Sequence, residues 1–229
     1  MLLAHPFDIR EHIFRSPQLQ ELMLDALRFF NGTPVHNLPP TTKFGGSGVY
    51  AIYYTGSFPI YQKVSAANRT SYSLPIYVGK AIPSGGRKGL KKSIDNEDSL
   101  HKRLREHTKS IKEAIAYAKS NLAEHQLSLA DFACRFIVVP GDESAIIAPI
   151  ESALIKQYQP LWNAAVDGFG NHTPGKRRFE QSRSQWDTLH VGRPWADKCK
   201  GPTPNLEGIF ADIKSHLQEL DSVTSDEVS

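Results

Sequence analysis

Two short segments, each built around a tyrosine, constrain the fold more than any other feature of this sequence. Residues 49–54 and 75–78 are rich in β-branched and aromatic residues and are bounded by glycines, so each predicts a short β-strand. Tyr50 and Tyr77 would therefore stand on neighbouring strands. A pair of strand tyrosines is most often ordinary sheet packing, so its functional meaning depends on residues further along the chain.

Composition places the chain among globular proteins. Its 229 residues can bury one core of ordinary size with an appended arm, and 40% of them are hydrophobic and 22% charged. No apolar run approaches the length of a membrane span, and charged residues begin too early for a signal peptide. The 2 cysteines imply no disulfide framework. We therefore expect a cytoplasmic protein that does not enter a membrane.

The basic residues are clustered, although the net charge of +3 says little by itself. One cluster lies in a glycine-rich loop, a second on a predicted helix, and a third follows the presumed core. Any one cluster is usually a solvated surface, but three around one loop favour a polyanionic partner, with DNA as the first candidate. The candidate DNA contacts are Arg87, Lys88, Lys91, Lys92, Arg105, Lys176, Arg177, Arg178, Arg183 and Arg193.

A helix predicted over residues 99–122 carries two side chains that break its pattern. Its leucines and isoleucines form an apolar stripe, and most of its basic residues lie opposite. Arg103 and His107 are four apart, so they share one face and adjoin the apolar stripe. An arginine at such a border often serves only to cover apolar surface with its stem. With a histidine one turn away, it can also hold a phosphate beside a proton transfer.

A glutamate stands in the apolar face of a later helix. After a strand predicted at 133–140, Asp142 is a ready N-cap, and apolar residues follow at helical spacing. Glu151 falls inside that apolar face, where a carboxylate is seldom buried without a partner. Two interpretations stay open: an ion pair with an arginine such as Arg103, or a cleft in which Glu151 binds a cation. Pro149 indicates a kink or a helix that starts one turn later.

Two further segments have structural interpretations. Residues 16–31 begin with Ser16 and Pro17 and carry apolar residues at helical spacing, which predicts a packing helix. Residues 57–74 form an insertion between the tyrosine strands, with a candidate further strand at 59–64. Such a loop could touch a ligand or a partner.

The ordered set of these residues resembles the pattern of the GIY-YIG nuclease superfamily. The matching positions are Gly48-Val49-Tyr50, Tyr77-Val78-Gly79-Lys80, Arg103 with His107, Glu151 and Asn163. The resemblance spans residues 45–165 and implies an α+β fold, with a small three-stranded antiparallel sheet flanked by helices. Residues 1–44 are then an N-terminal helical extension. Residues 166–229 are a C-terminal DNA-binding and dimer arm with a disordered tail.

The resemblance also implies catalytic roles. Glu151 binds one divalent cation, normally Mg²⁺, with Mn²⁺ as a substitute, which agrees with the preference of such cations for oxygen ligands. Arg103 stabilises charge on the phosphate, and Tyr50 takes a proton from the attacking water or orients it. Tyr77, Lys80 and His107 are expected to lower the effective pKa of Tyr50, since a free tyrosine is a poor base. Asn163 positions the core or the surroundings of the metal.

The run after Asn163 resembles the GIY-YIG restriction endonucleases that cut CCGCGG. We therefore expect a Type II restriction endonuclease that hydrolyses double-stranded DNA at a palindromic, G·C-rich site. We expect it to act as a homodimer, because two-fold symmetric protein matches a two-fold symmetric site. Two other interpretations stay open. One is a GIY-YIG nuclease of low specificity that acts in repair, and the other is a DNA-binding regulator in which Glu151 only pairs with Arg103.

Overall fold

A four-stranded antiparallel sheet is the centre of the structure, a computed structural model that describes residues 7–82, 98–173 and 179–226. The strands lie in the order β1-β4-β2-β3 and are β1 (His36–Asn37), β2 (Ser47–Tyr54), β3 (Tyr77–Ala81) and β4 (Phe132–Val139). The α+β class is confirmed. The described part of the sheet has one strand more than predicted, because β1 pairs with two residues of β4.

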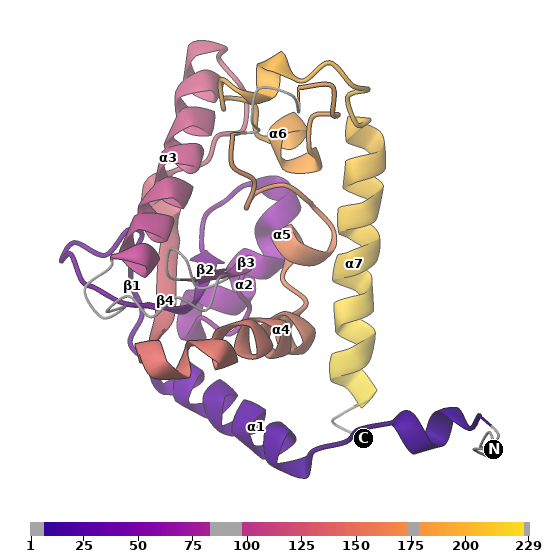
Figure 1. Ribbon diagram of the computed structural model, residues 1–229. Coiled ribbons are helices and arrows are strands. Elements are labelled where there is room, and N and C mark those ends of the chain that lie inside the picture. Colours follow the sequence, from indigo (N-terminus) through magenta and orange to yellow (C-terminus); the bar gives the residue numbers. More distant parts are fainter. Residues whose placement is uncertain (1–6, 83–97, 174–178, 227–229) are drawn as a thin grey trace.

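The central strand β2 is covered on both faces, and all eight of its residues are buried. Its odd-numbered side chains pack with α1 (Pro17–Gly32) and α4 (Ile147–Tyr158). Its even-numbered side chains, Tyr50 among them, pack with α3 (Ser99–Ser120). Successive side chains of a strand point to opposite faces, so the sheet lies between two helical layers, as Figure 1 shows.

Helix α1 begins as the sequence predicts. The Ser16 hydroxyl accepts a hydrogen bond from the Leu19 N–H, and Pro17 occupies the first turn. Phe30 is fully buried against the sheet, whereas Leu19 and Leu22 remain exposed. A short 3-10 turn, η1 (Ile9–His12), precedes this helix.

The insertion between the tyrosine strands is helical, so the strand predicted at 59–64 is wrong. It consists of the 3-10 turn η2 (Pro59–Tyr61) and the helix α2 (Gln62–Ser71). Tyr61, Val64 and Asn68 are buried, and their spacing of three and four residues is that of one helix face. Packing of this face against the core decides the conformation of a short segment whose composition is compatible with a strand.

Helix α4 starts one turn later than its apolar pattern suggests. The 3-10 segment η6 (Gly141–Ile146) precedes it, and Asp142 makes no capping hydrogen bond to either element. The predicted cap is therefore wrong. Pro149 lies in the first turn of α4, where a missing N–H costs nothing, and this agrees with the later start among the two interpretations of that proline.

The C-terminal segment packs onto the same core as the tyrosine strands. Its elements are α5 (Leu161–Ala164), α6 (Gln185–Leu189), η7 (Ala196–Lys198) and α7 (Leu206–Asp226), while η5 (Leu129–Asp131) leads into β4. Trp162, Phe169, Trp186 and Ile209 belong to the hydrophobic cluster that contains Tyr50. Helix α7 extends to Asp226. In the described ranges, no helix combines the length and apolar character that a bilayer crossing needs.

Candidate active site

Tyr50 and His107 form a buried pair between β2 and α3. The Tyr50 hydroxyl lies 2.6 Å from Nε2 of His107. Tyr50 has no exposed surface, and His107 is 2% exposed. Strand β2 presents Tyr50 to the α3 layer, and the apolar stripe of α3 turns His107 inward, so the pairing follows from the orientation of both elements.

The second tyrosine lies on β3 beside a glycine that the site requires. Tyr50 stands opposite Gly79 in the β2–β3 register, and its ring lies over the glycine. A Cβ atom at Gly79 would lie 2.5 Å from the Tyr50 hydroxyl and 2.9 Å from the ring of Tyr77. No other residue fits between the two phenols, which explains why a glycine follows Tyr77-Val78.

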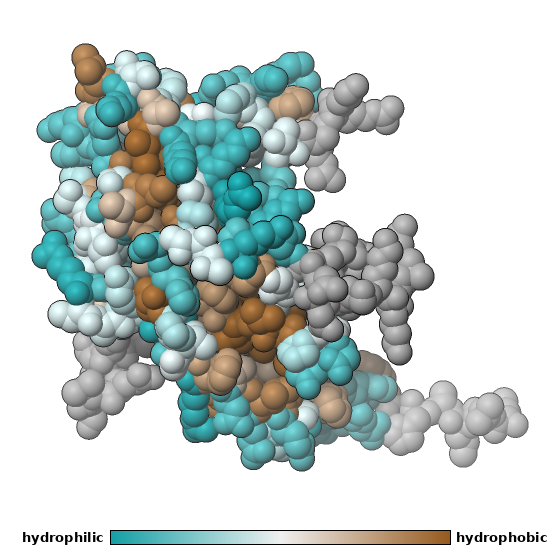
Figure 2. All heavy atoms as spheres, turned by 90° about the vertical axis from the view of Figure 1, so that its left-hand side faces the viewer, coloured by the Kyte–Doolittle hydropathy of each residue, from teal (hydrophilic) through white to brown (hydrophobic). Residues whose placement is uncertain are grey.

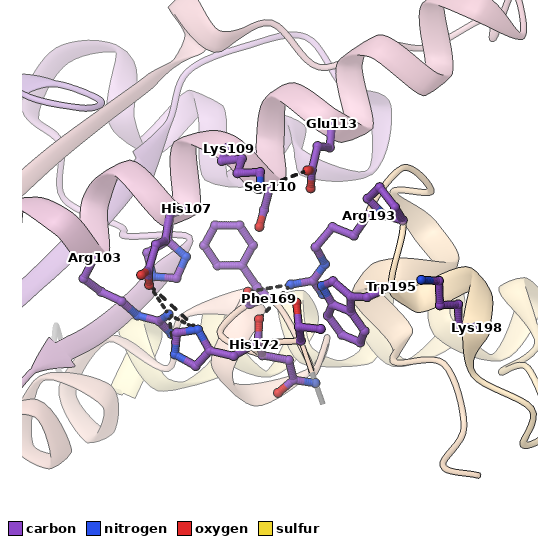
Figure 3. A pocket seen from close by; sticks show the side chains of 14 residues that line it. Arg103, His107, Lys109, Ser110, Glu113, Phe169, His172, Arg193, Trp195 and Lys198 are labelled. Atoms are coloured by element: carbon purple, nitrogen blue, oxygen red, sulfur yellow. Dashed lines mark hydrogen bonds and ion pairs between the residues drawn. The ribbon is translucent and has the colours of Figure 1, made fainter. Parts of the chain in front are cut away.

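Arg103 lies one turn before His107 and points into the same region (Figure 3). Its guanidinium donates to the carbonyl oxygen of Gly170 at 2.6 Å, to Oε2 of Glu106 at 3.0 Å and to Nε2 of His172 at 2.7 Å. The predicted alternative in which Arg103 pairs with Glu151 is not what forms. The partners of Arg103 come from its own helix and from the segment after α5.

Burial controls the protonation of the pair. It raises the pKa of Tyr50 well above its usual value, and the nearby Arg103 only partly offsets this rise. Burial, assisted by Arg103, also lowers the pKa of His107 well below its usual value. The expectation that neighbouring groups lower the pKa of Tyr50 overall is therefore wrong, because desolvation outweighs them. At neutral pH the phenol is protonated and the imidazole neutral, so the two groups share one hydrogen bond without a net charge, and the tautomer of His107 decides which of them donates.

Glu151 and Lys80 form an ion pair on the other side of β3. Nζ of Lys80 contacts Oε2 of Glu151, and the two side chains are 35% and 15% exposed. Lys80 and Val78 alternate with Tyr77 along β3, so Lys80 faces the α4 layer from which Glu151 projects. The partner that the sequence demanded for this carboxylate is thus a lysine.

The donor set at Glu151 decides which metals fit there. The described residues contain no group of three or more His, Cys, Asp or Glu side chains able to hold a metal ion. A single carboxylate does not suit a structural Zn²⁺ site. It does suit Mg²⁺, which keeps several waters and binds proteins through one or two carboxylates together with substrate phosphate.

Asn163 holds the outer edge of β3. Its side-chain oxygen accepts from the Val78 N–H at 2.8 Å, and its side-chain nitrogen donates to the Val78 carbonyl at 2.9 Å. It thereby takes the place of a further strand along this edge. Of the two interpretations of Asn163, positioning of the core is the one that this geometry matches.

Residues 168–171, called the 168–171 loop below, contact the site. They were not among the residues predicted to be catalytic. The ring of Phe169 stacks on His107, with centroids 4.5 Å apart, and meets Tyr77 edge-on at 4.9 Å. A Cβ atom at Gly170 would lie 2.5 Å from the Tyr77 hydroxyl. The sequence feature that indicates this contact is Gly168-Phe169-Gly170, because flanking glycines allow a backbone to approach a side chain closely.

The comparisons with known proteins agree with this arrangement. The model of the Eco29kI GIY-YIG domain matches residues 42–217 of the chain. The chain belongs to the Eco29kI GIY-YIG family. This is a family of GIY-YIG restriction endonucleases, so the chain is a nuclease of the restriction type and its partner is DNA. The search of curated proteins gave no match.

The basic face of α3 is the clearest candidate DNA contact among the described residues of this Eco29kI-family chain. Arg105 is exposed, as its position on the helix predicted. It lines a groove of about 630 Å³ together with Lys102, Lys109 and Lys112. These four cations form one stripe along α3, which suits a phosphate backbone, although Asp98 and Glu106 also line the groove.

The remaining candidate contacts divide into three groups. Arg183 pairs with Asp197 and is 21% exposed. Arg193 is 1% exposed and pairs with Asp187, which corrects the expectation that it contacts DNA. Outside the described residues lie Arg87, Lys88, Lys91, Lys92, Lys176, Arg177 and Arg178.

Two other hollows differ in their position relative to the site. One, of about 310 Å³, lies between α3 and the C-terminal segment and reaches the cluster at Arg103 and His107, but Glu106 and Glu113 make its charge mixed (Figure 3). The other, of about 580 Å³, lies beside β1 and β4 and is lined by Val35, Phe44, Phe136 and Val138 among others. Figure 2 shows apolar side chains gathered between hydrophilic ones on the side that carries α3 and these two strands. An apolar groove does not suit a polyanion, so we do not assign the hollow beside β4 to the DNA backbone.

Proposed function

We propose that this chain is a Type II restriction endonuclease that hydrolyses double-stranded DNA at a palindromic, G·C-rich site, with CCGCGG as the first sequence to test. The observation that carries the proposal is the convergence of Tyr50, Tyr77, Arg103 and His107 at β3, with Glu151 and Lys80 across the same strand. Membership in a restriction endonuclease family supports it.

In the proposed mechanism Tyr50 and His107 handle the proton of the attacking water. Tyr50 takes this proton while passing its own to Nε2 of His107, so that neither side chain has to be ionised beforehand. The raised pKa of Tyr50 and the lowered pKa of His107 leave both groups neutral before this exchange. Tyr50 has no exposed surface, so this role requires its neighbours to move and admit a water molecule to the hydroxyl.

Arg103 has the role of stabilising charge on the phosphate in the transition state. A guanidinium already oriented by Gly170 and Glu106 offers its donors without reorganisation during the reaction. Its nearness to both phenols is also what partly offsets the effect of burial on their pKa values. In this proposal the Arg103 guanidinium therefore acts beside Tyr50 and Tyr77.

Glu151 is the residue that would hold Mg²⁺ or Mn²⁺. A divalent cation bound there would supply Lewis-acid stabilisation of the phosphate, and the contact with Lys80 orients the Glu151 carboxylate. Removal of the carboxylate should therefore remove the cleavage activity that depends on metal.

Sequence recognition follows from symmetry and from arginine chemistry in this proposal. A homodimer matches a palindrome, and the forked donors of arginine fit O6 and N7 of guanine. Arg183 and the arginines outside the described ranges are the candidates for such contacts, and Arg105 is a candidate for phosphate contact. The cytoplasm, where a restriction enzyme meets foreign DNA, is the proposed place of action.

The test is a digest of plasmid DNA carrying mapped CCGCGG sites, in Mg²⁺, in Mn²⁺ and in EDTA. We expect discrete fragments that end within CCGCGG, and only with metal. Tyr50→Phe and Glu151→Gln are expected to lower the rate on the order of 10²–10³-fold, as loss of one preorganised catalytic group does. Glu143→Gln, an exposed carboxylate on η6, is the matched control and should cleave like the wild type.

The other outcomes separate the alternatives. Discrete fragments with other ends would refute CCGCGG but keep the restriction enzyme. A smear or nicked circles would indicate a nuclease of low specificity. Intact plasmid from folded protein that binds DNA equally with and without Mg²⁺ would indicate a regulator and give Glu151 a structural role.

A further inference from the structure

We propose that Arg193 and Asp187 are positioning residues of the nuclease site: their buried ion pair holds the 168–171 loop, and the loop orients the guanidinium of Arg103. This inference rests on the proposed function, because it takes Arg103 to be the group that stabilises phosphate charge. Among the described residues, the hydrogen bonds of Arg193 go to Asp187 and to the loop, and not to Arg103.

Arg193 is anchored on one side by a carboxylate. Its Nε donates to Oδ1 of Asp187 at 2.6 Å and its Nη2 to Oδ2 at 2.7 Å, with both side chains 1% exposed. The Ser184 hydroxyl donates to the same carboxylate at 2.7 Å. The guanidinium lies 4.6 Å from the ring centre of Trp186 and 4.7 Å from that of Trp195. A planar group held by two parallel hydrogen bonds and two rings has a defined orientation.

On its other side the guanidinium contacts the loop. Nη2 donates to the carbonyl of Gly168 at 2.8 Å, and Nη1 donates to the carbonyls of Phe169 and Asn171 at 3.2 Å each. The remaining carbonyl of these four residues, that of Gly170, is the one that accepts from Arg103 at 2.6 Å. The two arginines therefore divide the carbonyls of one short stretch between them.

Phe169 anchors the loop in the core, where it is 1% exposed and packs on Trp162 and Trp186, but this apolar packing does not fix the direction of the loop carbonyls. Gly168 has a φ of 95°, which only glycine adopts readily, and Gly170 has no side chain to pack. A buried ion pair adds little net stability compared with apolar residues of the same shape. What it supplies here is orientation, since Phe169 stacks on His107 and Gly170 contacts Arg103 only when the backbone stays in this position.

Arg193→Lys tests the proposal while keeping a charge opposite Asp187. Lysine has three donors on a point charge, so it cannot serve the carboxylate and three carbonyls together. We expect the single-turnover cleavage rate constant to fall roughly tenfold to a hundredfold, the effect of a small displacement of a catalytic group. The Kd for a cognate duplex, measured in EDTA, should stay within about twofold, because the lost interaction acts in the transition state.

A double-mutant cycle separates positioning from general loosening. In an Arg103→Lys background, Arg193→Lys should lower the rate by less than about threefold, because coupled residues do not give additive effects. The control is Lys200→Gln, which removes an exposed ion pair to Glu180 in the same C-terminal segment and should leave the rate unchanged. Circular dichroism and urea unfolding establish that each variant is folded.

If Arg193→Lys does not fold, Asp187→Asn weakens the anchor of Arg193 without introducing an atom beside Tyr77 or Arg103, and the same loss of rate is expected. A folded variant with the wild-type rate overturns the inference. Fully additive losses, or a rise of Kd that accounts for the loss of rate, overturn it as well. A wild-type protein that does not cleave DNA overturns the proposed function first, and the inference with it.

Discussion

The hydroxyl of Tyr50 lies 2.6 Å from Nε2 of His107, in a place that solvent does not reach. Burial moves the pKa of the phenol up and that of the imidazole down, so both stay neutral over the physiological range. A neutral phenol and a neutral imidazole form a donor and an acceptor without any charge, and this property leads to the first prediction.

The cleavage rate should not depend on ionisation of His107 near neutral pH. Because the pKa of His107 lies well below 6.5 in the folded protein, we expect a single-turnover rate constant without an ascending limb between about pH 6 and about pH 8. The measurement is the rate at saturating DNA across this range. An ascending limb centred near the ordinary pKa of histidine, and abolished in His107→Gln, would contradict the prediction.

Arg105 should contribute to DNA binding through a phosphate. Arg105→Gln is expected to weaken binding of specific and unrelated duplexes alike and to reduce the slope of log Kd against log salt by about 1. Fluorescence anisotropy in a series of salt concentrations measures it. Lys119→Gln, an exposed cation in the last turn of the same helix, is the matched control. An unchanged slope would place Arg105 outside the interface.

Asn163 should stabilise the edge of β3 through both of its polar atoms. Asn163→Ala leaves the Val78 N–H and carbonyl without their partner, so we expect unfolding free energy to fall by about 1–3 kcal/mol. Urea denaturation measures it. Asn121→Ala, which removes an exposed hydrogen bond at the end of α3, should change stability by less than about 0.5 kcal/mol. Equal effects of the two substitutions would mean that the hydrogen bonds between Asn163 and Val78 stabilise the fold no more than an exposed hydrogen bond does.

His190 should make the fold sensitive to acid. It lies 2.6 Å from the Tyr61 hydroxyl, and burial lowers its pKa from 6.5 to about 3. Between these two values the unfolded chain binds the proton and the folded chain does not, so stability is full above the unfolded pKa and falls as the pH drops through this window. The slope is about 1.4 kcal/mol per pH unit for one such group.

Urea denaturation at a series of pH values tests this with His190→Asn, which retains a hydrogen-bond acceptor for Tyr61 but cannot be protonated. The variant should lose less stability than the wild type between neutral pH and about pH 5. His107 adds to the slope in the same direction, so some acid sensitivity should remain. Parallel curves for the two proteins would contradict the prediction.

The sequence by itself determined the features that repeat locally. β-branched and aromatic residues bounded by glycines predicted the strands that carry Tyr50 and Tyr77, and the four-residue spacing predicted that Arg103 and His107 share one face of α3. The same local reasoning placed Arg105 on the solvent side and flagged Glu151 as a carboxylate in need of a partner. These inferences need only the geometry of one element.

Only the tertiary structure decided how distant elements meet. It paired Glu151 with Lys80 instead of Arg103, placed Arg193 in the interior and brought the 168–171 loop over His107. It also reversed the expected direction of the Tyr50 pKa. The physical reason is common to these cases: desolvation and pairing depend on what covers a side chain, and residues far apart in the sequence supply that cover.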